Sequence, residues 1–157
     1  MGRKKIACFS ITPSYLSTIE DRINGYKDAL SKHTGSSDTA IIKPIHFENI
    51  QGDVDAAMDD LLKNEPELDA IYALNNHIAT AILKSLKRKG FEALASKLKI
   101  ACFDDIELFN IIDKQVLSVS QPIEEIGRNA SILLLDIIEG KHENKSNIVL
   151  PTTLIER

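Results

Sequence analysis

The chain has 157 residues, enough for one domain of ordinary size, and a chain of this length buries roughly 68–70% of the surface that it exposes when unfolded. With 43% hydrophobic and 27% charged residues, its composition excludes a disordered or collagen-like chain. The net charge of −4 argues against a phosphate-binding surface for nucleic acid. Cys8 and Cys102 lie in separate apolar runs, which indicates a reducing compartment, and no apolar run has the length of a signal peptide or a membrane span. We therefore expect a cytoplasmic location and no membrane partner.

Short apolar runs rich in β-branched residues alternate with segments of helical period along the chain. In chain order, we expect strand Ile6–Ile11, helix Ser17–His33, strand Ile41–Phe47, helix Val54–Lys63, strand Ala70–Leu74, helix His77–Arg88, strands Lys99–Phe103 and Val116–Ser120, helix Ile123–Ile138 and strand Ile148–Ile155. This alternation predicts an α/β fold with a parallel sheet flanked by helices on both faces.

The motifs that mark common enzyme classes are missing. The sequence has no nucleophile elbow, no phosphate-binding P-loop and no dinucleotide-binding glycine motif. Its four histidines are scattered without metal-ligand spacing. Asp104 and Asp105 are adjacent, so their side chains point in different directions and are poorly placed to act on one proton. We predict no catalytic residues, no metal site and no cofactor.

Polar and aromatic side chains stand where the predicted strands end. Phe47 closes the second strand, Asn75 and Asp104 directly follow the third and fourth, Gln121 follows the fifth, and Arg22 lies early in the first helix. Ligands of open parallel sheets bind at the carboxyl ends of the strands. Asp accepts from hydroxyl groups, Asn and Gln donate and accept, Arg donates in a fork and an aromatic ring covers a sugar face, so this set suits a polyhydroxylated ligand.

A simpler interpretation stays open for two of these residues. Asn and Asp are favourable N-caps, and both Asn75 and Asp104 precede segments that could begin a helix. Each residue taken alone fits a capping role as well as a binding role.

Five segments, in this order and spacing, resemble the LacI/GalR family of transcriptional regulators. They are Arg22-x-x-Gly25-Tyr26, Asp69-Ala-Ile-Tyr-Ala-Leu-Asn75-Asn76, Phe103-Asp104-Asp105, Leu117-Ser-Val-Ser-Gln121-Pro122 and Leu150-Pro-Thr-Thr-Leu-Ile-Glu-Arg157. The family has an effector-binding core like that of periplasmic binding proteins, joined to a DNA-binding helix-turn-helix head. The resemblance covers the second half of the core only.

The resemblance implies a role for each segment. Residues 1–121 would form the C-terminal subdomain, 122–149 a crossover segment that packs on a missing first subdomain, and 150–157 a terminal strand. Arg22, Asn75 and Asp104 would contact the effector, a sugar or related metabolite. Gln121 would lie in the crossover, with Phe47 as a wall. Asn76 stands where the family usually has Asp, which affects the helix cap more than the binding role.

The resemblance also implies a homodimer, and operator DNA as a partner only through a head domain that this chain lacks. We expect the dimer surface at His77, Ala81, Lys84, Phe109 and Ile112, with Phe109, Ile111 and Ile112 as a partly exposed apolar patch. Packing of these three residues into the local core is the alternative. The apolar face of helix 123–138 lacks a partner, so we expect it to pack against a second copy or to exchange between two chains.

A second class of function shares the core fold, namely the sugar-binding component of an uptake system. The absence of a visible export signal and the ending Leu154-Ile-Glu-Arg157 favour the regulator. A sugar-modifying enzyme has no supporting residues.

Overall fold

The computed structural model describes residues 5–13, 15–35, 40–88, 90–141 and 147–157. Its strands are β1 (Ile6–Thr12), β2 (Ile41–His46), β3 (Ala70–Ala73), β4 (Lys99–Phe103), β5 (Val116–Ser120) and β6 (Thr153–Ile155). Its α-helices are α1 (Ser17–Thr34), α2 (Ile50–Asn64), α3 (Asn76–Ser85), α4 (Glu92–Lys97) and α5 (Ile123–Ile138), and two 3-10 turns are η1 (Phe47–Asn49) and η2 (Glu107–Asn110).

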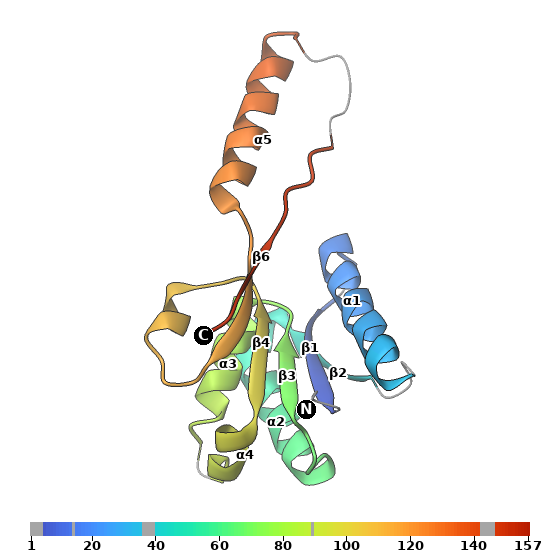
Figure 1. Ribbon diagram of the computed structural model, residues 1–157, viewed down its shortest axis with the longest axis vertical. Coiled ribbons are helices and arrows are strands. Elements are labelled where there is room, and N and C mark those ends of the chain that lie inside the picture. The colour runs from blue at the N-terminus through green and yellow to red at the C-terminus, as the bar shows by residue number, and fades with distance from the viewer. Residues whose placement is uncertain (1–4, 14, 36–39, 89, 142–146) are drawn as a thin grey trace.

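The strands form one sheet in the order β2-β1-β3-β4-β5-β6, in which β1 to β5 are parallel (Figure 1). The predicted α/β fold is therefore confirmed. The final strand differs from the prediction: β6 runs antiparallel to β5 and spans three residues instead of Ile148–Ile155. Pro151 has no N–H to donate within that stretch, which disfavours a longer strand.

The two faces of the sheet are covered unequally. Because parallel crossovers are right-handed, α1 lies on one face while α2, α3 and α4 lie on the other (Figure 1). On β4, Ile100 and Cys102 are 2% and 1% exposed, and alternate positions of β4 and β5 are more open, with Leu117 at 37%. The face that carries α1 is thus partly uncovered over β4 and β5.

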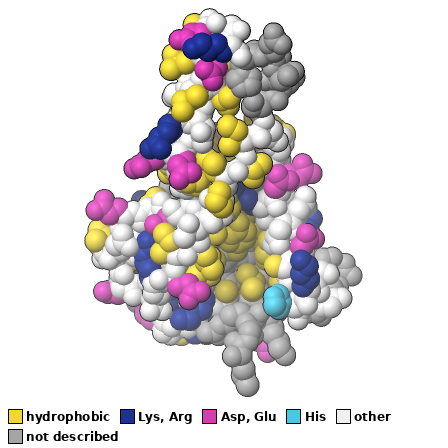
Figure 2. All heavy atoms as spheres, turned by 45° about the horizontal axis from the view of Figure 1, so that its top comes forward, with side chains coloured by type: hydrophobic (Ala, Val, Ile, Leu, Met, Phe, Trp, Pro, Cys, Tyr) yellow, Lys and Arg dark blue, Asp and Glu magenta, His cyan; other side chains and the backbone are white. Residues whose placement is uncertain are grey.

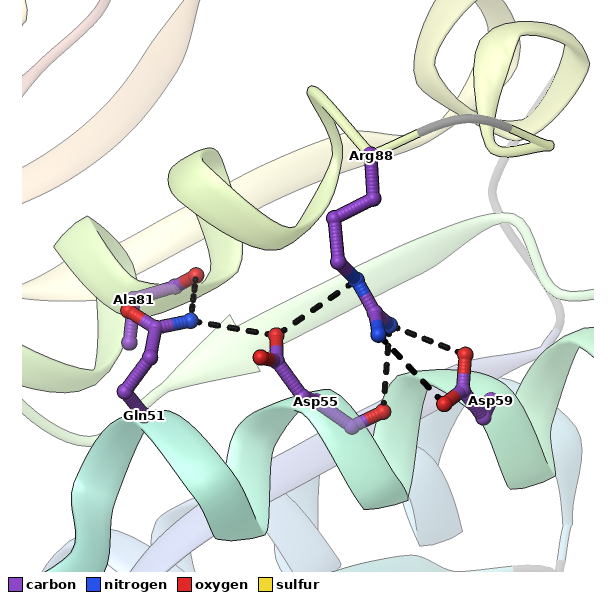
Figure 3. A network of polar contacts seen from close by, with 5 residues as sticks. All are labelled: Gln51, Asp55, Asp59, Ala81 and Arg88. Atoms are coloured by element: carbon purple, nitrogen blue, oxygen red, sulfur yellow. Dashed lines mark hydrogen bonds and ion pairs between the residues drawn. The ribbon is translucent and has the colours of Figure 1, made fainter.

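The packing of α2 against α3 is reinforced by a polar network (Figure 3). Arg88, just beyond α3, donates from Nη2 to a carboxylate oxygen of Asp59 at 2.9 Å and to the carbonyl oxygen of Asp55 at 3.2 Å. Gln51 Nε2 donates to the Asp55 carboxylate at 3.1 Å and to the carbonyl oxygen of Ala81 at 3.3 Å. These contacts hold α2 and α3 together on the face of the sheet that the helices cover most completely.

Helix boundaries follow the predictions in part. The structure places α5 at the predicted Ile123–Ile138, whereas α3 ends at Ser85 instead of Arg88 and α2 begins at Ile50 instead of Val54. Helix α4 was not predicted, because its six residues are too few to display a helical period.

Helix α5 projects away from the sheet (Figure 1), and none of its residues is buried. Its apolar side chains include Ile123 at 73%, Leu134 at 57% and Ile138 at 71% exposure. The sheet of this chain therefore provides no partner for the apolar face of the helix.

Candidate functional site

A groove of about 890 Å³ lies between α1 and the partly uncovered face of the sheet. Figure 2 shows hydrophobic side chains gathered in a hollow below α5. Apolar residues of the groove include Tyr72, Leu117 and Val119, and two of the predicted site residues, Arg22 and Gln121, also line it. The groove runs along the sheet face from Ile6, Ala70 and Lys99, at the amino ends of β1, β3 and β4, to Arg22, Phe103 and Gln121 at the carboxyl edge. Strand order reverses at β1, whose neighbours are β2 and β3, so the carboxyl edge there is a topological switch point of the kind where α/β proteins bind ligands.

Arg22 is held by the ends of two strands. Its Nη1 donates to the carbonyl oxygen of Leu74, directly after β3, at 2.8 Å. Its guanidinium carbon lies 3.8 Å from the centroid of the Phe103 ring, at the end of β4. Stacking and hydrogen bonding together fix the orientation of a planar, always charged donor at the carboxyl edge of the sheet.

Asp104 has a left-handed backbone, with φ 77°, immediately after β4. Asp tolerates this conformation better than most residues do. Its N–H donates to the carbonyl oxygen of Val119 at 3.0 Å, and its carboxylate accepts from Nε2 of Gln121 at 2.5 Å. The structure therefore brings these two predicted site residues into direct contact, from the ends of two neighbouring strands.

Asn75 is the N-cap of α3. Its Oδ1 accepts from the backbone N–H of Ile78 at 2.9 Å, so the capping interpretation is confirmed for this residue. The cap of η2 is Ile106, and the Asp104 carboxylate makes no cap hydrogen bond there. The capping interpretation therefore holds for Asn75 and not for Asp104, although both residues fitted it in the sequence.

Phe47 stands apart from the other site residues. It opens η1 at the end of β2, an edge strand of the sheet, is 66% exposed and does not line the groove. Beside it, His46 Nδ1 lies 2.7 Å from a carboxylate oxygen of Asp53, which also accepts from the His46 backbone N–H at 2.8 Å. These hydrogen bonds lower the pKa of the Asp53 carboxyl, the backbone N–H contributing most.

Two groups near the site have raised pKa values. Burial raises the pKa of the Tyr72 hydroxyl and of the Cys102 thiol to about 12 each, and the negative charge of Asp104 acts in the same direction on both. A thiol with so high a pKa is a poor nucleophile at neutral pH. Within the described parts of the chain, His, Cys, Asp and Glu form no group of three or more that could hold a metal ion.

Sequence reasoning missed two contributors to this edge of the sheet. Phe103, on which Arg22 stacks, appeared in the sequence only as the last residue of a strand and as part of a family segment, without a role in the site. Asp105 forms an ion pair with Arg157 at 2.9 Å, although the two residues are far apart in the sequence. Neither contact leaves a signal in sequence spacing.

The expected dimer residues divide into exposed and buried side chains. His77 and Lys84 are exposed on α3, and Lys84 and Ile112 line a second groove of about 480 Å³ between α3 and residues 108–114. Ala81 is 4% and Phe109 2% exposed, so the expectation of a partly exposed Phe109 is wrong. The ring of Phe109 instead belongs to the hydrophobic core, because the short turn η2 directs it inward.

Among the described residues, no helix combines the length and the apolar content that crossing a membrane requires.

Comparison with known proteins agrees with the fold. A family model described as a periplasmic binding protein-like domain matches residues 1–157. The PurR repressor of Vibrio atlanticus is 28% identical over 156 residues, which make up 99% of this chain and 46% of that protein. The CytR repressor of Escherichia coli K12 is 30% identical over 99% of this chain and 45% of its own length.

Among solved structures, a LacI family transcriptional regulator from Enterococcus faecium, with bound ribose, superposes with a TM-score of 0.82. The likeness has 24% sequence identity and covers 99% of this chain and 56% of that one. The fold is therefore that of a periplasmic binding protein-like domain. The chain belongs to the periplasmic binding protein-like domain family, and the predicted resemblance to LacI-type regulators is confirmed. It spans about half the length of the curated relatives that it matches.

Proposed function

We propose that this chain is the second half of the effector-binding core of a LacI-type transcriptional regulator, and that its effector is a sugar. The observation that carries the proposal is the arrangement at the carboxyl edge of the sheet, where Arg22 is oriented by Phe103 and Asp104 is joined to Gln121. The guanidinium of Arg22 donates several hydrogen bonds in fixed directions, and the carboxylate of Asp104 accepts from two hydroxyl groups. These are the hydrogen bonds that a sugar requires.

Regulation requires a second subdomain that closes on the effector. In this proposal α5 packs on that subdomain, since its apolar face finds no partner in the described chain, and β5 and β6 flank the hinge. The effector shifts the equilibrium between open and closed cores only by its differential affinity for the two states. A head domain outside this chain, in a cytoplasmic homodimer, would carry that shift to operator DNA.

A thermal-shift screen of the full-length regulator against D-ribose, cellobiose and D-arabinose tests the function. An effector present at about 100 times its Kd adds roughly 2.7 kcal/mol to the free energy of unfolding. Two results together would support a sugar-responsive regulator: one sugar stabilises the protein, and the same sugar changes its affinity for operator DNA in either direction. No stabilisation by any of the sugars would overturn the sugar assignment.

The role of Asp104 has a sharper test. Asp104→Gly removes the carboxylate and relieves the left-handed backbone, whereas Asp104→Ala removes the carboxylate and keeps the strain. Both variants should lose on the order of 1.5–3 kcal/mol of sugar-binding free energy by calorimetry, the value of hydrogen bonds to a charged group. Asp28→Asn, at an exposed position of α1, is the control. Unchanged affinity in both Asp104 variants would contradict the assignment.

A further inference from the structure

Arg157 connects three separate segments next to the site. Its Nη2 lies 2.9 and 3.0 Å from the two carboxylate oxygens of Asp105, and Nη1 donates to Oγ of Ser118 on β5 at 2.8 Å. Nε donates to Oδ1 of Asn110 in η2 at 2.8 Å. Ser118 Oγ in turn donates to Asp105 at 2.6 Å. All three guanidinium nitrogens are therefore engaged, each with a different segment or residue.

The part of this network around Asp105 and Ser118 is shielded from water, whereas Asn110 is exposed. The side chains of Arg157 and Asp105 are 16% and 19% exposed, and Ser118 is fully buried. Charge-assisted hydrogen bonds from the rigid, planar guanidinium group are stronger and more directional when they are shielded from water than when they are exposed. A lysine at position 157 could reach one of these partners but could not hold Asp105, Ser118 and Asn110 together.

The network binds Asp105, the residue next to Asp104. Ser118 precedes by one residue the Val119 whose carbonyl oxygen accepts the Asp104 N–H. Two contacts thus restrain the loop that holds Asp104 in its left-handed conformation. Gln121 donates to the Asp104 carboxylate, and Arg157 forms an ion pair with the adjacent Asp105. Arg157 itself follows β6, the strand beside β5.

We propose that Arg157 is a positioning residue for the effector site: through Asp105, Ser118 and Asn110 it holds the loop after β4 so that Asp104 presents its carboxylate at the sheet edge. The part of this inference that concerns sugar affinity rests on the proposed function. The part that concerns the conformation of Asp104 does not, because it is measured without a ligand.

Arg157→Gln and Asp105→Asn remove the charge from either side of the pair with little change in shape. The matched control is Arg88→Gln, which breaks a second guanidinium–carboxylate network, the one between Arg88 and Asp59 (Figure 3). Arg88 lies beyond the far end of α3, whereas Asn75 caps the end of that helix at the site. A loss of general stability should appear in all three variants.

Amide hydrogen exchange at Asp104 and the side-chain amide signal of Gln121 in an NMR spectrum separate positioning from stability. In both site variants we expect Asp104 exchange to become about tenfold faster, the effect of about 1.4 kcal/mol in a local opening equilibrium, and the Gln121 signal to shift. Arg88→Gln should leave the Gln121 signal in place and change Asp104 exchange no more than exchange along β1 and β3. Equal effects in Arg88→Gln and Arg157→Gln, or no effect in Arg157→Gln, would overturn the proposal.

Titration of the full-length protein with D-ribose gives the second readout. We expect Arg157→Gln to weaken binding about tenfold, which corresponds to about 1.4 kcal/mol, and Arg88→Gln to leave it unchanged. If ribose binds the wild-type protein and both variants equally, the positioning role is wrong. If ribose does not bind the wild-type protein, ribose is not its effector, and the exchange measurement alone decides the role of Arg157.

Discussion

The guanidinium of Arg22 stacks on the ring of Phe103, with 3.8 Å between its central carbon and the ring centroid. Arg22 comes from α1 and Phe103 from the end of β4, so the contact ties a helix on the less covered face to the carboxyl edge of the sheet. The same guanidinium donates to the carbonyl oxygen of Leu74. Arg22 therefore contributes to the fold as well as to the candidate site.

Replacing Arg22 by Lys should test both contributions. Lysine keeps the charge but loses the flat stacking surface and the fork, so we expect the free energy of unfolding to fall by about 1–2 kcal/mol and sugar affinity to fall as well. Urea unfolding and calorimetry measure the two effects. Lys32→Gln in the last turn of the same helix is the control. Wild-type values for Arg22→Lys in both measurements would show that the stacked arrangement has no energetic role.

The chain of 157 residues should self-associate through α5 when it is produced by itself. Each large apolar side chain is worth roughly 1.5–3 kcal/mol when buried, and Leu134, Ile137 and Ile138 are 57%, 62% and 71% exposed. Light scattering should give a mass above that of one chain, and Leu134→Glu with Ile138→Glu should restore the monomer. The control Asn129→Glu adds charge at a polar position of the helix. A monomeric wild-type chain with native circular dichroism would contradict this prediction.

The second groove offers a test of the expected dimer surface that avoids the core. Ile111 lines this groove and is 77% exposed, so Ile111→Asp should weaken dimer formation in the full-length protein without unfolding it. Phe109→Asp places a charge in the core and should instead lower the melting temperature strongly. Sedimentation and thermal unfolding distinguish these effects. A dimer of unchanged affinity in Ile111→Asp would count against this surface.

Stability should depend on pH through Asp53. Its folded-state pKa is lowered from the ordinary value of 3.8, chiefly by the backbone N–H of His46, so its contribution to stability is fully present above that value. The contribution is lost as pH falls from about 3.8 through the lowered folded-state value. Asp53→Asn should therefore reduce stability at pH 7 and show a smaller further loss toward pH 2 than the wild type. Urea unfolding over this pH range, with Asp28→Asn as control, measures the difference; parallel pH curves for Asp53→Asn and the wild type would exclude the mechanism.

Local sequence pattern was sufficient to predict most of the architecture. Short apolar runs located β1 to β5 and a period of 3.6 located α5, because a strand covered on both faces is apolar throughout and a helix buries one face. The same pattern placed Arg22, Asp104 and Gln121 at one edge, since parallel strands end on the same side of a sheet. Elements too short to show a period, such as α4 and β6, were missed or given the wrong length.

Side-chain partners were decided by the tertiary structure alone. The periodic pattern of the chain assigns a residue to a face, but it carries no information about which distant segment covers that face. The inward turn of Phe109, the stacking of Arg22 on Phe103 and the pairing of Asp105 with Arg157 across 52 positions each depend on how the strands are ordered in the sheet. For the same reason, the sequence could not distinguish the roles of Asn75 and Asp104. Only the three-dimensional contacts show that Asn75 caps a helix and that the Asp104 carboxylate accepts a hydrogen bond from Gln121.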